Sequence, residues 1–441
     1  MISDSIITEI SCLGETKVPN PVLKRTDGID DKSFVSNESR VILDVDESRV
    51  SQMIEQSQPL PSFELAGPRR KIFFDPSKLK CALVTCGGLC PGLNDIIRSI
   101  VLELHYGYGV SNIFGIRYGL QGFIAEYGHD LINLTCESVV NIHDRGGTVL
   151  GSSRGPQDMD EIVDSLERMN IGLLFMIGGD GTLTAAGRIT DKIAARGLKI
   201  GIVGVPKTID NDIYMVSRSF GFDTAVDVAT SAIISASNEA EGYPNGIGLI
   251  KLMGRHSGFI AATAVLAQQD VNFVLIPEVD FDLEGPNGLL NALEKRLADR
   301  KHAVIVVAEG AGQRFFENEK NELDASGNIK LKDIGIYLKE AIGAHFAGKG
   351  IDISIKYIDP SYMIRSLPAN ANDRVFCNFL GRNSVHAGMS GRTGMLIGHW
   401  NNQFVHIPMK LIAEKRKKVN PGGSLWRSTL EATGQGSLKS K

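Results

Sequence analysis

The sequence is poor in cysteine and contains no long apolar run. Its six cysteines form no CxxC pair and no zinc-binding spacing, so we expect reduced thiols in a cytoplasmic protein. No apolar stretch approaches the ~18 residues that a membrane-spanning helix needs. The opening residues MISDSIITEI lack a basic region followed by an apolar one, which counts against a signal peptide.

No charge of one sign dominates either. The 441 residues include 47 Lys and Arg against 51 Asp and Glu, a formal net charge of −4. Nucleic acids and membrane surfaces attract basic proteins, so neither is expected as the main partner. An apolar content of 43% is ordinary for a globular enzyme, and the length indicates two or three domains. We interpret the basic stretch AEKRKK (413–418) as a solvated helix end.

Short apolar runs followed by amphipathic segments begin near residue 80. Runs of six or seven residues rich in Val, Ile and Leu suit strands that are buried on both faces. Alternating strands and helices predict a doubly wound α/β fold with mostly parallel sheets. Because the body exceeds about 300 residues, we expect two Rossmann-like lobes with the active site in the cleft between them. The predicted strands are 81–86, 171–177, 200–205, 247–253, 271–276, 302–308 and 353–358.

Six of these predicted strands end in polar or glycine-rich loops, where ligands gather in open α/β sheets. In GGDGT, Gly179 and Gly181 leave room beside Asp180 for a polyphosphate and its Mg²⁺ ion. The segment PKTIDND (206–212) gathers two acids, a lysine and a threonine at one strand end. The other loops are GGLCPGLND, GRHSGF, EGAGQ and DPSYMIR.

Two familiar nucleotide motifs are not matched. GIVGVPKT resembles a phosphate-binding P-loop, but Pro206 replaces the second glycine and has no N–H to donate. GDGTLTA has Thr184 where a dinucleotide-binding fingerprint needs its third glycine. We therefore reject a Walker-type fold and disfavour a dehydrogenase.

The motifs GGDGT, PKTIDND, MGRHSGF, LIPE and VAEGAGQ, in this order, closely resemble those of the 6-phosphofructokinases. They look like the long ATP-dependent branch found in plants and some protists and bacteria, over about residues 80 to 400. The resemblance implies that fructose 6-phosphate is phosphorylated at C1 by ATP with Mg²⁺, giving fructose 1,6-bisphosphate and ADP in glycolysis. It also implies an allosteric enzyme that forms a homotetramer or a homodimer.

The resemblance assigns catalytic roles residue by residue. Asp210 matches the catalytic base, Arg154 an arginine that bridges the donor and acceptor phosphates, and Arg255 an arginine near the reacting centre. Gly88 matches the glycine that faces the transferred phosphate. We interpret Lys207 as a counter-charge that keeps the pKa of Asp210 low and its carboxylate ionised.

Binding roles follow from the same resemblance. Asp180 matches the Mg²⁺-linked acid, Glu309 a ligand of a sugar hydroxyl, and Lys356 and Arg365 the basic residues that grip the 6-phosphate. The implied cofactor-binding residues are Gly88, Arg154, Gly179, Asp180, Gly181 and Thr182. The implied substrate-binding residues are Thr208, Asp210, Asp212, Met253, Gly254, Arg255, Glu309, Lys356, Tyr362 and Arg365.

The resemblance also divides the chain into lobes. Residues 76–220, with a return segment at about 366–400, are expected to form the nucleotide-binding lobe. Residues 221–365 are expected to form the sugar-phosphate-binding lobe. The polar residues 1–75 are expected to be an arm that lies on the body or is partly disordered, and 401–441 to form a carboxy-terminal extension.

Some positions depart from the family pattern. Pyrophosphate-dependent members combine the lysine found here as Lys207 with an aspartate at position 181; the glycine here favours ATP, because an acid would repel its α-phosphate. Gly246 replaces a substrate-binding arginine, and Tyr362 replaces a histidine of the sugar site. Of two bacterial effector-site arginines, Arg98 has a counterpart and Leu102 replaces the other, so control by ADP or phosphoenolpyruvate is not expected to carry over.

Three alternatives remain open at this point. Pyrophosphate could be the donor for the same sugar chemistry. A lipid or NAD kinase could share GGDGT, but TIDND and MGR would then be unexplained. A non-catalytic regulatory subunit usually loses the base or the metal acid, whereas this chain keeps Asp180, Asp210 and Arg255.

Overall fold

The computed structural model describes residues 7–22, 34–320, 322–323, 327, 329–412 and 415–440. The chain divides into two compact units. Unit 1 takes the described residues up to Thr208, together with Ile213–Gly221 and Leu367–Arg416. Unit 2 takes Ile209–Asp212, Phe222–Ser366 and the described residues from Lys417 onward. The chain thus passes from unit 1 to unit 2 inside the motif PKTIDND, between Thr208 and Ile209.

Unit 1 is built on a nine-stranded sheet with the order β3-β4-β17-β16-β10-β9-β6-β7-β8. The strands from β16 to β7 in this order run parallel, and antiparallel strands extend both edges. The strands are β3 (Arg40–Ile42), β4 (Ser62–Leu65), β6 (Lys80–Thr85), β7 (Asn112–Ile116), β8 (Ile132–Asn133), β9 (Leu173–Gly178), β10 (Gly201–Pro206), β16 (Met395–Trp400) and β17 (Gln403–Pro408).

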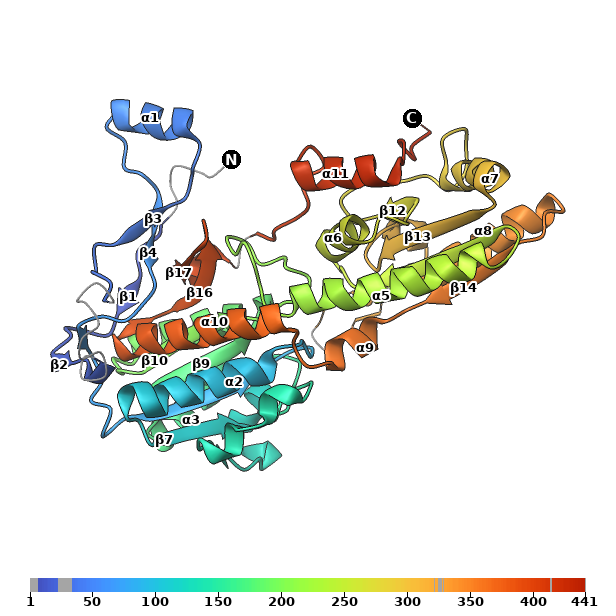
Figure 1. Ribbon diagram of the computed structural model, residues 1–441. Helices are drawn as coiled ribbons and strands as arrows, with labels where there is room; N and C mark the ends of the chain where they lie inside the picture. The colour runs from blue at the N-terminus through green and yellow to red at the C-terminus, as the bar shows by residue number, and fades with distance from the viewer. Residues whose placement is uncertain are drawn as a thin grey trace. The chain divides into compact units, whose positions relative to one another are not determined.

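Helices cover both faces of this sheet, which explains why its central strands are apolar throughout (Figure 1). On one face α3 (Met159–Arg168) and α4 (Asp180–Ala195) share an apolar core with β6, β9 and β10. Two further helices, α2 (Leu93–Leu102) and α10 (Ala371–Met389), pack side by side, and α10 also contacts β10. A π-helix, Glu103–Tyr108, continues α2, and α1 (Glu47–Glu55) precedes β4.

Part of the amino-terminal region, for which an arm was expected, belongs to unit 1. Two of its strands, β3 and β4, extend the large sheet. A short ladder joins it to later residues, where β1 (Ser11–Cys12) pairs with β15 (Arg392–Thr393). A second ladder lies within the region, where β2 (Val18–Pro19) pairs with β5 (Lys71–Ile72). These strands are too short to show a periodic pattern in the sequence.

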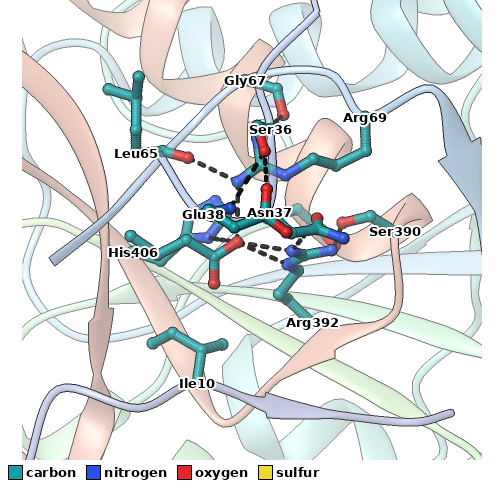
Figure 2. Close-up of polar contacts among 12 residues, drawn as sticks. Ile10, Ser36, Asn37, Glu38, Leu65, Gly67, Arg69, Ser390, Arg392 and His406 are labelled. Carbon is teal, nitrogen blue, oxygen red and sulfur yellow. Dashed lines mark hydrogen bonds and ion pairs between the residues drawn. The ribbon is translucent and has the colours of Figure 1, made fainter. Parts of the chain in front are cut away.

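Buried ionic contacts at Glu64 link these amino-terminal strands to the rest of unit 1. Figure 2 labels three of its neighbours, Arg69, Arg392 and His406. Arg69 Nη2 donates to Glu64 Oε1 at 2.8 Å, and Arg392 Nη2 donates to the same oxygen at 2.6 Å. His406 of β17 lies opposite Glu64 in the ladder, with its Nδ1 3.5 Å from Oε1. Arg392 also donates to Asn37 Oδ1 at 2.8 Å. Residues 64–69, Arg392 and His406, three separate stretches of the chain, therefore meet at one carboxylate.

Unit 2 has a four-stranded parallel sheet with the order β12-β13-β11-β14. One face shares an apolar core with α7 and α8, while α5 and α6 pack on β11 and β13 and α11 packs on α6 (Figure 1). The strands are β11 (Gly246–Leu252), β12 (Phe273–Leu275), β13 (His302–Ala308) and β14 (Ser354–Ile358). The helices are α5 (Phe222–Glu241), α6 (Phe259–Ala267), α7 (Leu289–Arg300), α8 (Ile334–Gly348), α9 (Ser361–Ser366) and α11 (Ser424–Thr433).

All seven predicted strands are present, in two mostly parallel sheets flanked by helices, as the doubly wound α/β prediction requires. Within the residues expected to form a carboxy-terminal extension, β17 belongs to the sheet of unit 1 and α11 to unit 2. All six cysteines lie in the described ranges, and no disulfide joins them. Among the described helices, none combines the length and apolarity needed to cross a bilayer.

Candidate active site

The loop after β6 turns sharply at Gly87. Its φ of +84° lies in the left-handed region that favours glycine. Ser152 Oγ donates to the Gly87 carbonyl at 2.6 Å, and the Gly87 N–H donates to the Ser153 carbonyl at 3.1 Å. A Cβ on Gly88 would lie 3.3 Å from the guanidinium of Arg154. The structure thus brings the predicted Gly88 and Arg154 together.

Lys207 follows the last residue of β10 and is buried in unit 1. Its Nζ donates to the Gly88 carbonyl at 2.7 Å, and its N–H donates to the Gly178 carbonyl at 2.9 Å. Pro206 pairs with Gly178 inside the β9–β10 ladder, so this segment is strand and not a P-loop, as predicted. Lys207 therefore joins the loop after β6 to the end of β9.

The GGDGT motif forms the beginning of α4. Gly179 is the N-cap and has no side chain to bond the first N–H groups of the helix. Such N–H groups, together with the helix dipole, attract anions such as phosphate. A Cβ on Gly181 would meet no described atom within 4 Å, whereas Thr182 is buried in the same turn. Four of the predicted nucleotide-binding residues, Gly179, Asp180, Gly181 and Thr182, therefore share one helix end that can bind a phosphate.

Asp180 is the first residue of α4, and its carboxylate has a basic neighbour that the motif analysis missed. The Nε of Arg416 lies 3.4 Å from Asp180 Oδ2. Among the described residues, no group of three or more His, Cys, Asp and Glu could hold a metal ion. Mg²⁺ would thus need phosphate oxygens as ligands in addition to Asp180. A set of one or two carboxylates and several phosphate oxygens suits this ion.

Asp210 belongs to unit 2 and lies against the loop that follows β11. Its Oδ2 accepts a long hydrogen bond of 3.4 Å from the Arg255 N–H, and its carbonyl accepts one of 3.2 Å from Ser257 Oγ. The residue is partly exposed, but its Oδ1 is buried. Asn211 next to it has a φ of +54°, a left-handed conformation that asparagine tolerates. The turn at 209–212 thus carries the predicted base to the end of β11.

The pKa of Asp210 is raised to about 7, which overturns the expectation of a low pKa. Burial is the main cause, and the nearby negative charges of Asp212 and Glu309 add to it. Arg255, through its N–H, and Arg365, through its charge, act in the opposite direction. The expected counter-charge, Lys207, instead donates to a carbonyl of unit 1. Asp210 is therefore about half protonated at neutral pH.

Glu309 and the loop after β11 approach each other closely. The Glu309 N–H donates to the Leu252 carbonyl at 2.9 Å, and the Gly310 N–H donates to the Gly254 carbonyl at 3.1 Å. A Cβ on Gly310 would lie 2.1 Å from the Arg255 carbonyl, so only glycine fits there. Gly254 itself has a φ of +129°. These glycines position the predicted Met253, Gly254, Arg255 and Glu309 at the ends of β11 and β13.

Two predicted basic residues lie near this loop. Arg365 of α9 has its Nε 3.3 Å from the Sδ of the buried Met253. The guanidinium of Arg255 donates to the backbone carbonyl of Ile329, away from its own N–H contact with Asp210. Arg365 is thus close to the predicted sugar residues through its side chain, whereas Arg255 is close through its backbone.

Lys356 and Tyr362 have different surroundings from these residues. The Nζ of Lys356 lies 3.9 Å from Glu239 and 4.7 Å from the centre of the Tyr243 ring. Both neighbours precede the beginning of β11, whereas Asp210 lies at its other end. Tyr362 is 82% exposed. The structure does not group either side chain with the predicted sugar residues, and their substrate-binding roles stay predictions.

Thr208 and Asp212 flank the base along the chain. The Thr208 carbonyl accepts a 2.6 Å hydrogen bond from Ser219 Oγ in unit 1, while Asp212 is buried in unit 2. The Asp212 carbonyl accepts a 2.8 Å bond from the N–H of Lys417, and burial lowers the pKa of Lys417 to about 8 although the charge of Asp212 opposes this. Residues 415–420 contain no helix, so the solvated helix end expected at 413–418 is wrong for its described part.

The basic stretch was the available signal for the two residues that the sequence analysis missed. Arg416 and Lys417 are consecutive, yet the first contacts Asp180 and the second contacts Asp212. A run of exposed cations usually marks a solvated surface, and nothing in its spacing indicates which acids it meets.

Comparison with known proteins identifies the family. The family model described as Phosphofructokinase matches residues 80–387. The ATP-dependent 6-phosphofructokinase of Borreliella burgdorferi is 49% identical over 439 residues, covering 98% of each chain. That of Amycolatopsis methanolica is 47% identical and covers 97% of this chain and 94% of its own. ATP-dependent 6-phosphofructokinase 7 of Arabidopsis thaliana is 48% identical, covering 85% of this chain and 77% of its own.

Solved structures support the fold. A pyrophosphate-dependent phosphofructokinase from Marinobacter aquaeolei is similar, with a TM-score of 0.66, 20% identity, and coverage of 81% of this chain and 92% of that chain. A phosphofructokinase from Saccharomyces cerevisiae gives a TM-score of 0.59 at 24% identity, covering 76% of this chain and 45% of that chain. The family predicted from the strand-end motifs is confirmed: the chain belongs to the phosphofructokinases.

Proposed function

We propose that this chain transfers the terminal phosphoryl group of ATP to the C1 hydroxyl of fructose 6-phosphate, giving fructose 1,6-bisphosphate and ADP in glycolysis. The position of Asp210 is the observation that carries the proposal: it lies at the loop after β11 with a pKa raised to about 7. A general base is most effective when its pKa is near the working pH. Relatives named ATP-dependent 6-phosphofructokinase support the same reaction.

Residues of unit 1 are proposed to bind the donor. The N–H groups at the beginning of α4 can donate to phosphate oxygens. The absence of a side chain at Gly88 leaves room for these oxygens. Arg154 and Lys207, both at the Gly88 loop, supply positive charge where phosphoryl transfer needs it. When bound, Mg²⁺ supplies further charge neutralisation on the phosphates, with Asp180 as its proposed protein ligand.

Residues of unit 2 are proposed to bind and activate the sugar phosphate. The ionised fraction of Asp210 accepts the proton of the C1 hydroxyl as its oxygen attacks the phosphorus atom. Glu309 and the loop Met253–Arg255 are proposed to hold the sugar, and Arg365, with Lys356, its 6-phosphate.

The choice of ATP over pyrophosphate is supported by Gly181. A Cβ at this position would have no described atom within 4 Å, so there is space for the rest of the nucleotide. Lys207 is the feature that favours the alternative, because pyrophosphate-dependent members of the family share it.

Assaying the purified chain with each donor tests the proposal. We expect fructose 1,6-bisphosphate to form with ATP and Mg²⁺, and at least about a hundredfold less with pyrophosphate, since a nucleotide site supplies binding energy that pyrophosphate cannot use. The reverse preference would contradict the choice of donor. No turnover with either donor would favour a regulatory subunit, whereas turnover by the single chain would exclude it.

The assembly and location of the protein are also proposals. A homo-oligomer, a tetramer or a dimer, in the cytoplasm is supported by analogy with the family alone. Light scattering of the purified chain measures the mass of the oligomer, and a single-chain mass would contradict this proposal.

A further inference from the structure

The proposed metal-binding acid has a counter-charge in the structure. The Nε of Arg416 is 3.4 Å from Asp180 Oδ2, and the two side chains are 38% and 24% exposed. The pair is thus open enough to exchange partners with a solute, because exposed ion pairs are weak and easily broken.

Arg416 is positioned by its backbone. It forms a β-bridge with Ile213, directly after the IDND segment, and the next residue, Lys417, donates its N–H to the Asp212 carbonyl at 2.8 Å. These backbone contacts hold the main chain of Arg416 at a position from which its side chain reaches Asp180.

The negative charge of Asp180 at the beginning of α4 opposes the binding of phosphates there. ATP without a metal ion carries about four negative charges at neutral pH, and its phosphates would approach the same N–H groups that surround Asp180. A bare carboxylate there would repel them. Once Mg²⁺ binds with the phosphates, the ion neutralises the Asp180 carboxylate in place of the Arg416 guanidinium.

We propose that Arg416 is a positioning residue of the nucleotide site that neutralises Asp180 until Mg²⁺ takes its place. This inference rests on the proposed role of Asp180 as the metal acid. It makes Arg416 and the divalent cation competitors for one carboxylate.

Binding of ATP in the absence of fructose 6-phosphate, measured by calorimetry, separates the two roles without turnover. For Arg416→Gln we expect affinity for ATP in EDTA to fall by about five- to tenfold, because Asp180 then repels the phosphates more strongly. Affinity for ATP in Mg²⁺ should fall by less than about twofold, because the cation replaces the lost charge.

Three further variants complete the test. Lys415→Gln removes the same charge from the neighbouring residue, whose Nζ lies 5.8 Å from the centre of the Tyr214 ring, and should change neither affinity by more than about twofold. Asp180→Asn combined with Arg416→Gln should restore most of the loss seen in EDTA, as coupled residues do in a double-mutant cycle. Arg416→Lys keeps the charge and should lie between wild type and Arg416→Gln.

Equal losses with and without Mg²⁺, no loss in EDTA, or failure of the double variant to recover would each overturn the proposal. A failure of the proposed function looks different. If the unmodified chain binds pyrophosphate but not ATP, the proposed donor is wrong. Comparing the affinities of wild type and Arg416→Gln for pyrophosphate, with and without Mg²⁺, then still tests the role of Arg416, because pyrophosphate also presents phosphates and binds the same cation.

Discussion

Glu64 in unit 1 and Asp210 in unit 2 are acids whose surroundings move their pKa in opposite directions. Burial raises the pKa of both. At Glu64, hydrogen bonds and charges from His406, Arg392 and Arg69 overcome this effect and bring the pKa well below its ordinary value. The carboxylate is therefore ionised at neutral pH, and it holds ion pairs with Arg69 and Arg392.

At Asp210 the neighbours have the same sign as the group itself. The charges of Asp212 and Glu309 add to the effect of burial, so a proton can leave and return near pH 7. The comparison shows that burial does not decide what an acid does. Opposite charges around Glu64 make it part of the fold, and like charges around Asp210 prepare it to exchange a proton.

The largest expected effect that separates the two acids is on turnover. Asp210→Asn removes the proposed base, and we expect kcat to fall by about 10²–10⁴-fold, which is what general-base catalysis contributes. Binding of fructose 6-phosphate, measured by calorimetry, should change little because the amide keeps the shape of the side chain.

Asp352→Asn, at an exposed acid of the same unit, is the matched control and should leave kcat within about twofold of the wild type. Retention of more than about a tenth of the wild-type kcat by Asp210→Asn would contradict the assignment of the base.

The second effect is a loss of stability when the charge partners of Glu64 are left unpaired. Glu64→Gln leaves the buried Arg69 and Arg392 without their charge partner, so we expect the free energy of unfolding in urea to fall by about 3–5 kcal/mol. Glu431→Gln, which breaks an exposed pair with Arg427 on α11, should change it by less than about 0.5 kcal/mol. Equal effects of the two variants would show that the contacts at Glu64 are not important for the fold.

The third effect is the pH dependence of stability. Because the folded-state pKa of Asp210 is raised above its unfolded value of about 4, the folded state holds the extra proton between pH 4 and 7, and this stabilising contribution is lost as the pH rises through about 7. Asp210→Asn should therefore raise the melting temperature more at pH 8 than at pH 5. Glu64 has the opposite sign: its lowered pKa gives stability above about pH 4.3 that is lost on further acidification.

A melting-temperature difference between Asp210→Asn and wild type that is the same at both pH values would mean that the pKa of Asp210 is ordinary in the folded protein.

Much of the fold and the approximate position of the site could be predicted because strand ends are a local signal. The run IGIVGV predicts a buried strand, and the charges of PKTIDND directly after it indicate a ligand site at its end. The amino-terminal strands β3 and β4 gave no such signal, since they are only three and four residues long.

The electrostatics of the site could not be predicted, because they depend on residues far apart in the chain. Lys207 is three residues from Asp210 in the sequence, yet its Nζ bonds to Gly88, whereas the distant Glu309 influences the base. Arg416 reaches Asp180 from a stretch whose composition indicates only a solvated surface. Sequence neighbours therefore predicted the wrong direction for the pKa of Asp210.

The pH dependence of kcat/KM for fructose 6-phosphate tests most directly whether like charges prepare Asp210 as the base. With ATP and Mg²⁺ saturating, we expect kcat/KM to rise with pH and level off above an apparent pKa near 7. Glu309→Gln should move this rise to lower pH by about half a pH unit, whereas Glu294→Gln, at an acid paired with Lys349 on other helices, should not move it. A flat profile between pH 6 and 8, or a rise that Glu309→Gln leaves in place, would contradict the account.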